Sequence, residues 1–146
     1  MILTSPSFEN NGNIPRKFTC DGGNINPELQ IQNIPEGAKS LALILHDPDA
    51  PMPGGFTHWV AWNINPTTTV IKEESIPPGA DEGRNGGGEI GYVGPCPPSG
   101  IHHYRFRLYA LSGMLDLPPT TTAKDLEVQM KQYLIETAEL VGLYGR

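Results

Sequence analysis

Three segments of the chain have the hydrophobic pattern of β-strands. Residues 40–47 (SLALILHD) are apolar almost throughout, as expected for a buried strand, and they stop at the Pro- and Gly-rich run DPDAPMPGG. Residues 57–64 (THWVAWNI) and 101–112 (IHHYRFRLYALS) alternate with a period of two. A further short strand is predicted over residues 2–8, and residues 17–40 are predicted to form extended pieces interrupted by turns.

The period changes in the last part of the chain, where apolar residues recur at helical spacing. These positions are Leu126, Met130, Leu134, Ala138 and Val141. Thr122 fits an N-cap with Asp125 three residues later, and Gly142 fits a helix stop. We therefore expect one amphipathic helix near the C-terminus, which packs on the body of the protein. Binding of a partner through its apolar stripe is the alternative.

Composition agrees with a mainly β protein. The 146 residues include 17 Gly and 15 Pro, which favours many short strands joined by fixed turns over a helical bundle. Residues 65–99 hold few apolar side chains and are interpreted as an extended surface excursion. Because no repeat, linker or low-complexity tract divides the chain, residues 1–146 are predicted to form a single domain.

Charge and cysteine content narrow the class of protein. A formal net charge of −6 gives no general attraction for nucleic acid or for an anionic membrane. Neither a signal peptide nor a membrane-spanning run is recognisable, so we expect a cytoplasmic protein. Cys20 and Cys96 match no zinc or redox spacing, and in such a protein we expect two reduced thiols, with a disulfide as the alternative.

Polar side chains interrupt the apolar faces of the three strong strands at their ends. Asp47 closes the face of the first strand, His58 opens that of the second, and His102 and Tyr104 open that of the third. If the first strand runs antiparallel to the others, these four side chains meet at one end of one sheet. The apolar residues expected on the same faces are Leu41, Leu43, Leu45, Val60, Trp62, Ile64, Phe106 and Leu108.

Each polar residue alone has a structural explanation, such as a turn opener for Asp47. Titratable groups gathered over an apolar floor are costly unless something uses them, so their convergence predicts a small ligand pocket.

Three blocks of sequence resemble a known family. DPDAP at residues 47–51, HWVAWNI at 58–64 and GPCPPSGIHHYRFRLYAL at 94–111 are similar to signatures of the phosphatidylethanolamine-binding protein family, also called Raf kinase inhibitor-like proteins. FTCDGGNINPELQ and ELVGLYGR resemble its small prokaryotic branch. The resemblance covers nearly the whole chain, and the order and separation of the blocks are highly specific.

The resemblance implies a two-sheet antiparallel β-sandwich with a few peripheral helices, and a homodimer. It also implies a pocket for anions such as phosphate, phosphorylated headgroups or acetate, without a metal or cofactor. By motif position the ligand-binding residues are Asp47, Pro48, Asp49, His58, Gly94, Pro95, His102 and Tyr104. The chain departs from the usual His-Arg-Tyr with His102-His103-Tyr104, and the opposite parity of His103 predicts that it lies outside the pocket.

These observations lead to the hypothesis of a non-enzymatic binding or regulatory protein for a small anionic or phosphorylated ligand. Protonated His58 and His102 and the Tyr104 hydroxyl would donate to the anion, while Asp47 would orient a histidine or accept from the ligand. The family also suggests inhibition of a kinase or protease by surface contact. An enzyme that uses the histidines, aspartate and tyrosine for acid–base chemistry is the alternative, although the motifs place no Ser or Cys nucleophile. A metal site has suitable ligand types but no known spacing.

Overall fold

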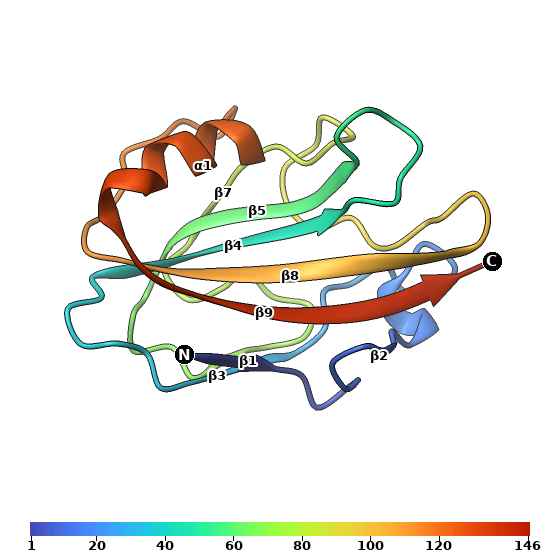
Figure 1. Cartoon of the computed structure of the whole chain (residues 1–146), viewed down its shortest axis with the longest axis horizontal. Helices are drawn as coiled ribbons and strands as arrows, with labels where there is room; N and C mark the ends of the chain where they lie inside the picture. Colours follow the sequence, from blue (N-terminus) through green and yellow to red (C-terminus); the bar gives the residue numbers. More distant parts are fainter.

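The structure, a computed structural model of residues 1–146, contains two β-sheets and one short α-helix stacked in three layers (Figure 1). The larger sheet has the strand order β2-β9-β8-β4-β5-β7 and the smaller has the order β1-β3-β6. All pairings are antiparallel except the short parallel pair β2–β9. This architecture confirms the prediction of a mainly β sandwich with peripheral helices.

The elements have the following bounds. The larger sheet contains β2 (Gly12–Asn13), β4 (Ser40–Asp47), β5 (Phe56–Ile64), β7 (Asp81–Glu82), β8 (Ile101–Leu111) and β9 (Leu134–Gly145). The smaller sheet contains β1 (Ile2–Thr4), β3 (Leu29–Gln32) and β6 (Val70–Ile71). The helical elements are the 3-10 turns η1 (Arg16–Phe18) and η2 (Lys131–Tyr133) and the α-helix α1 (Ala123–Met130). None of them is long and apolar enough to cross a membrane.

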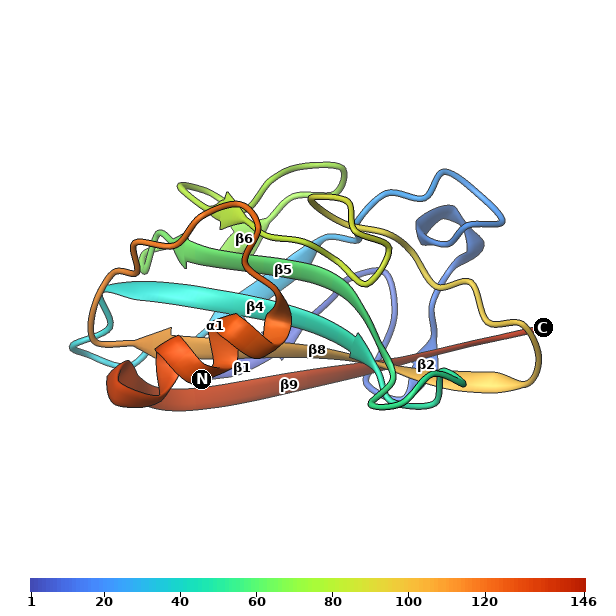
Figure 2. The same ribbon diagram turned by 90° about the horizontal axis from the view of Figure 1, so that it is seen from above.

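The central strands β4 and β5 of the larger sheet are buried on both faces, whereas β8 and β9 leave part of one face exposed. One face meets the smaller sheet in a core that includes Leu43, Leu45 and Phe106, and the other meets α1 in a second core that includes Ala42 and Ile44. Figure 2 shows α1 lying across this second face. Because β4 contributes to both cores, nearly every residue of SLALILHD must be apolar, which explains the absence of alternation in that segment.

The predicted C-terminal helix is wrong beyond Met130. The capping box of Thr122 and Asp125 is present, but α1 ends after Met130, and residues 134–145 form β9. This strand pairs with β8 along its whole length. Gly142 is not a helix stop but lies opposite Tyr104 in the sheet. A Cβ at residue 142 would come within 2.4 Å of the Ile14 side chain, so a larger residue would not fit beside it.

The prediction that His58, Val60, Trp62 and Ile64 share one face of β5 is also partly wrong. Val60 and Trp62 contact the core beneath α1, whereas Trp59 and Ala61 belong to the core between the sheets. The pairing of β5 with β4 is irregular at two places, between Leu45/His46 and between Leu41/Leu43, and each irregularity inserts an extra residue into β5. The first of these bulges lies at His58, so this residue points into the sandwich although Val60 and Trp62, on the same parity, contact the core beneath α1.

Cys20 and Cys96 form a disulfide, so the prediction of two reduced thiols is wrong. The two residues are 76 positions apart, in two loops that run side by side. The Cys20 N–H donates to the Pro95 carbonyl over 3.1 Å, and the Gly94 N–H donates to Asn24 Oδ1 over 2.7 Å. Closing a loop of this length restricts the unfolded chain and stabilises the fold by about 4 kcal/mol.

Candidate functional site

A pocket of about 250 Å³ opens at the end of the larger sheet where β4 finishes and β8 begins. Because β4 runs antiparallel to β5 and β8, the polar ends of the three strands come together there, as alternation predicts. The residues that line the pocket are Asp47, Ala50, Pro51, Met52, Phe56, His58, Val93, Gly94, Cys96, Pro97, Pro98, His102 and Tyr104.

Asp47 and His102 form a buried pair on the floor of the pocket. His102 Nδ1 lies 2.7 Å from Asp47 Oδ2, and because a carboxylate only accepts, Nδ1 donates. The other oxygen of Asp47 accepts the N–H of Asp49 over 2.8 Å. Both carboxylate oxygens are therefore engaged, and Asp47 holds the His102 ring so that Nε2 is left for the pocket.

His58 is fixed from the opposite wall. Its Nδ1 donates to the Val93 carbonyl over 2.7 Å, which leaves Nε2 as an acceptor when the ring is neutral. Burial lowers the pKa of His58 below its ordinary value, against the opposing effects of the Val93 carbonyl and the charge of Asp47. The neutral form of the ring is therefore favoured at pH 7.

Tyr104 lies between the two histidines. Its ring centroid is 5.3 Å from that of His58 and 6.3 Å from that of His102, and the residue is fully buried. The hydroxyl has no hydrogen-bond partner in the protein. Burial, followed by the negative charge of Asp47, raises the pKa of Tyr104, so the hydroxyl keeps its proton as a donor. A buried donor without a partner costs about 1–3 kcal/mol, which an acceptor in the pocket would recover.

Asp49 and His103 lie outside the pocket and form a second pair. Asp49 Oδ2 accepts from both the backbone N–H and Nδ1 of His103, each over 2.7 Å. The backbone bond, followed by the side-chain bond, lowers the pKa of Asp49. The structure thus confirms that His103 points away from the pocket. Of the eight predicted residues, Asp47, His58, Gly94, His102 and Tyr104 line the pocket, and Pro48, Asp49 and Pro95 do not.

Comparison with known proteins agrees with this architecture. The sequence model of the family described as phosphatidylethanolamine-binding protein matches residues 4–145. The chain belongs to the phosphatidylethanolamine-binding protein family.

Relatives of the chain span archaea and bacteria. A UPF0098 protein of Pyrococcus horikoshii is 49% identical over 99% of this chain and 77% of its own length. A UPF0098 protein of Methanothermobacter thermautotrophicus is 46% identical over 100% of this chain and 99% of its own.

Two crystal structures share the fold over 99% of this chain and 97% of theirs. A phosphatidylethanolamine-binding protein homologue from Chlamydia trachomatis is 39% identical with a TM-score of 0.95. E. coli YbcL, described as a member of the mammalian family, is 31% identical with a TM-score of 0.92.

In this member of the phosphatidylethanolamine-binding protein family, the pocket has an apolar wall that the sequence pattern does not predict. The wall is formed by Met52 in the loop before β5, by Phe56 at the start of β5, and by Val93 and Pro97 in the loop before β8. Met52 and Pro97 belong to the runs DAPM and CPP, but no periodicity shows which way a loop side chain points. The pocket therefore combines a polar floor with an apolar mouth. No group of three or more His, Cys, Asp or Glu side chains is placed to hold a metal ion.

Proposed function

We propose that the chain is a non-enzymatic binding protein whose pocket takes phosphate or a phosphorylated headgroup of the phosphatidylethanolamine type. The observation that carries this proposal is the hydroxyl of Tyr104, which is buried without a partner in a residue that lines the pocket together with His58 and His102. Unprotonated phosphoryl oxygens accept hydrogen bonds only, which matches one fixed donor and two groups that become donors when protonated.

The binding geometry follows from the partners of each histidine. Asp47 accepts from Nδ1 of His102, so a protonated Nε2 of that ring would donate to the ligand. The Asp47 carboxylate would then compensate the positive charge of the ring from the opposite side. The Val93 carbonyl holds Nδ1 of His58 in the same way. Because burial favours the neutral form of His58, an anion that contacts this ring would bind together with a proton. The apolar mouth accommodates the uncharged part of the ligand.

No Ser or free Cys nucleophile lines the pocket, which supports a binder over an enzyme. The one cysteine on the pocket wall is Cys96, which is in a disulfide, and both oxygens of Asp47 already accept hydrogen bonds. One observation favours acid–base catalysis as a second candidate, namely the neutral His58, whose Nε2 could accept a proton. Hydrolysis of a phosphate ester that depends on His58 and survives Tyr104→Phe would support this candidate.

Calorimetric titration with phosphate and with O-phosphorylethanolamine tests the proposal. We expect saturable binding to the wild type at pH 5.5 and an affinity about tenfold lower for Tyr104→Phe, since a hydrogen bond to a charged acceptor contributes about 1.5 kcal/mol or more. His103→Ala serves as the matched control and should bind as the wild type does. Equal affinities of the wild type and Tyr104→Phe would exclude the hydroxyl as a ligand donor and overturn the proposal.

A further inference from the structure

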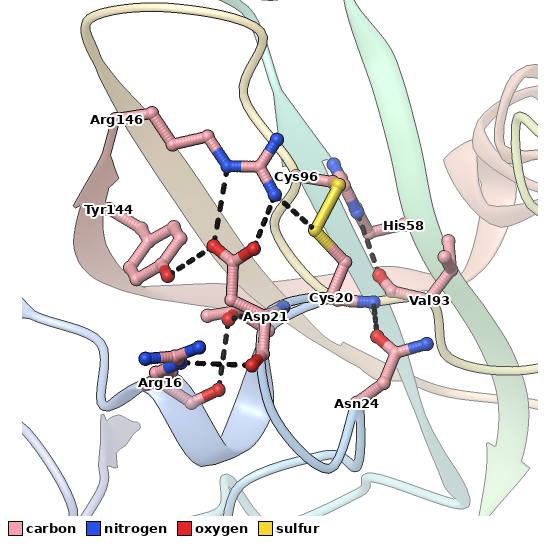
Figure 3. Close-up of a disulfide and its surroundings, with 11 residues drawn as sticks. Arg16, Cys20, Asp21, Asn24, His58, Val93, Cys96, Tyr144 and Arg146 are labelled. Atoms are coloured by element: carbon pink, nitrogen blue, oxygen red, sulfur yellow. Dashed lines mark hydrogen bonds and ion pairs between the residues drawn. A yellow bond between two sulfur atoms is a disulfide. The ribbon is translucent and has the colours of Figure 1, made fainter.

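The disulfide between Cys20 and Cys96 is part of the pocket wall (Figure 3). Cys96 lines the pocket and is exposed, whereas Cys20 is only partly exposed. A structural disulfide in a core is protected from thiols by its burial, but this one lies at the mouth of the pocket where a thiol can reach it.

The disulfide is the one covalent cross-link between residues 91–100, the segment of the pocket wall that carries Cys96, and the rest of the protein. No backbone hydrogen bond joins residues 96–99 to another segment. Just before them, the Pro95 carbonyl accepts from Cys20 and the Gly94 N–H donates to Asn24. Val93, in the same segment of the wall, contacts the pocket floor, because its carbonyl accepts from Nδ1 of His58. Reduction of the disulfide can therefore affect His58 on the pocket floor through its contact with Val93.

We propose that the pair Cys20–Cys96 is a redox-active site for thiol–disulfide exchange, and that its reduction releases the pocket wall and weakens ligand binding. The reductant is a dithiol, either a small molecule or a thioredoxin-class protein. The effect on ligand binding rests on the proposed function of the pocket, whereas the exchange reaction and the release of the wall do not.

The chemistry has a defined direction. A thiolate of the reductant attacks the exposed Sγ of Cys96, the S–S bond breaks, and Cys20 leaves as a thiolate with the bonding electrons. Arg146 Nη2 lies 3.4 Å from Cys20 Sγ and is placed to donate to that thiolate. Asp21 forms an ion pair with Arg146 and accepts from the Tyr144 hydroxyl, which keeps the guanidinium in place.

The second thiol of the reductant completes the exchange. As a thiolate, it attacks the other sulfur of the reductant, which is bonded to Cys96 in the mixed disulfide. Cys96 then leaves as a thiolate. The reductant is oxidised to a disulfide by two electrons, and the two protein thiolates take up the protons that the reductant thiols lost. The reverse reaction with an oxidised dithiol restores the bridge.

The exchange step is tested by trapping and mass spectrometry on the native protein. Dithiothreitol without denaturant is expected to reduce the bridge, so that iodoacetamide then labels both cysteines. With the monothiol glutathione, the mixed disulfide is expected on Cys96. Resistance of the folded protein to dithiothreitol would overturn the proposal, and a glutathione adduct on Cys20 would overturn the direction of attack.

Release of the wall is tested by hydrogen–deuterium exchange, which needs no ligand. We expect the amides of residues 91–100 and 19–26 to exchange at least tenfold faster in the reduced protein, with β4 and β8 unchanged. The double variant Cys20→Ser/Cys96→Ser should match reduced wild type and not respond to dithiothreitol. Unchanged exchange in the wall, or faster exchange throughout the chain, would show that the bridge does not control the wall.

The affinity for O-phosphorylethanolamine separates the two proposals. We expect at least fivefold weaker binding after reduction. Equal affinity in both redox states would overturn the control of binding and leave the pocket function standing. A lack of binding to the oxidised protein would overturn the pocket function, while the exchange data still decide whether the bridge controls the wall.

Discussion

Two aspartate–histidine pairs lie at the same end of β8, and both have a nitrogen–oxygen distance of 2.7 Å. Their aspartates are separated by one residue along the chain, and their histidines are adjacent. In the pair Asp47–His102 the side chains are 4% and 8% exposed, and in the pair Asp49–His103 they are 39% and 47% exposed. The same contact in water is weak, because solvent screens it and competes for the hydrogen bonds. Inside the pocket the same contact fixes the His102 ring. The two pairs therefore differ in their burial and not in their chemical groups.

The alternation of β8 produces this difference. His102 and His103 are neighbours on one strand and therefore point to opposite faces, one into the sandwich and one to solvent. Asp47 ends β4, and the turn that follows carries Asp49 to the outer side, where it also accepts the backbone N–H of His103. The outer pair thus tethers the loop after β4 to β8.

The largest expected difference between the pairs is in stability. Asp47→Ala should lower the free energy of unfolding by about 3 kcal/mol, because it leaves His102 buried without an acceptor and also removes the acceptor of the Asp49 N–H. Asp49→Ala, as the matched variant, should cost about 1 kcal/mol or less. Urea denaturation of both variants measures the two values. Similar losses would show that burial does not distinguish the pairs.

The pH dependence of binding should follow the histidines that line the pocket and not His103. The pKa of His58 is lowered by burial, so the folded protein favours the neutral ring, and without ligand it should lose stability as the pH falls below about 6.5. An anion that binds together with a proton should bind up to tenfold more tightly for each pH unit lowered between 7.5 and 5.5.

Dimethyl phosphate is a suitable ligand for this measurement because its own charge does not change over that range. The dependence should be weaker in His58→Gln and unchanged in His103→Ala. A flat affinity between pH 5.5 and 7.5 in the wild type would mean that the histidines are not the partners of the anion.

The smallest expected effect concerns salt. The charge component of the Asp49–His103 pair is open to solvent, so raising the salt from 0.05 M to 0.5 M should move the pKa of Asp49 part of the way back toward its ordinary value. The backbone N–H bond should keep the rest of the shift. NMR titration of the Asp49 carboxyl carbon measures both parts, and a complete return in high salt would show that the backbone bond contributes nothing.

Much of the polar floor could be predicted from the sequence because it depends on strand alternation and on strand ends. The positions of Asp47, His102 and Tyr104 follow from period two, and the outward direction of His103 follows from the same rule. His58 lies at the pocket for a different reason from the one alternation suggests, since a bulge turns it inward. A bulge leaves no mark in the hydrophobic pattern of β5.

Two errors have physical causes that sequence periodicity cannot resolve. Met130, Leu134 and Ala138 are spaced by four, which places residues on one face of a helix and equally on one face of a strand. Pairing along the whole of β8 decides for the strand. The disulfide depends on the approach of two loops 76 residues apart, which no local pattern encodes.

The central claim is that the inner pair, and not the outer one, forms a site for phosphorylated ligands. An amide-shift NMR titration with O-phosphorylethanolamine at pH 5.5 on wild type, His102→Ala and His103→Ala tests it most directly. We predict saturable shifts clustered in residues 47–58 and 93–104 for wild type and His103→Ala, and their loss in His102→Ala with the fold retained. Equal binding by both variants, or no saturable shift at millimolar ligand in the wild type, would contradict the claim.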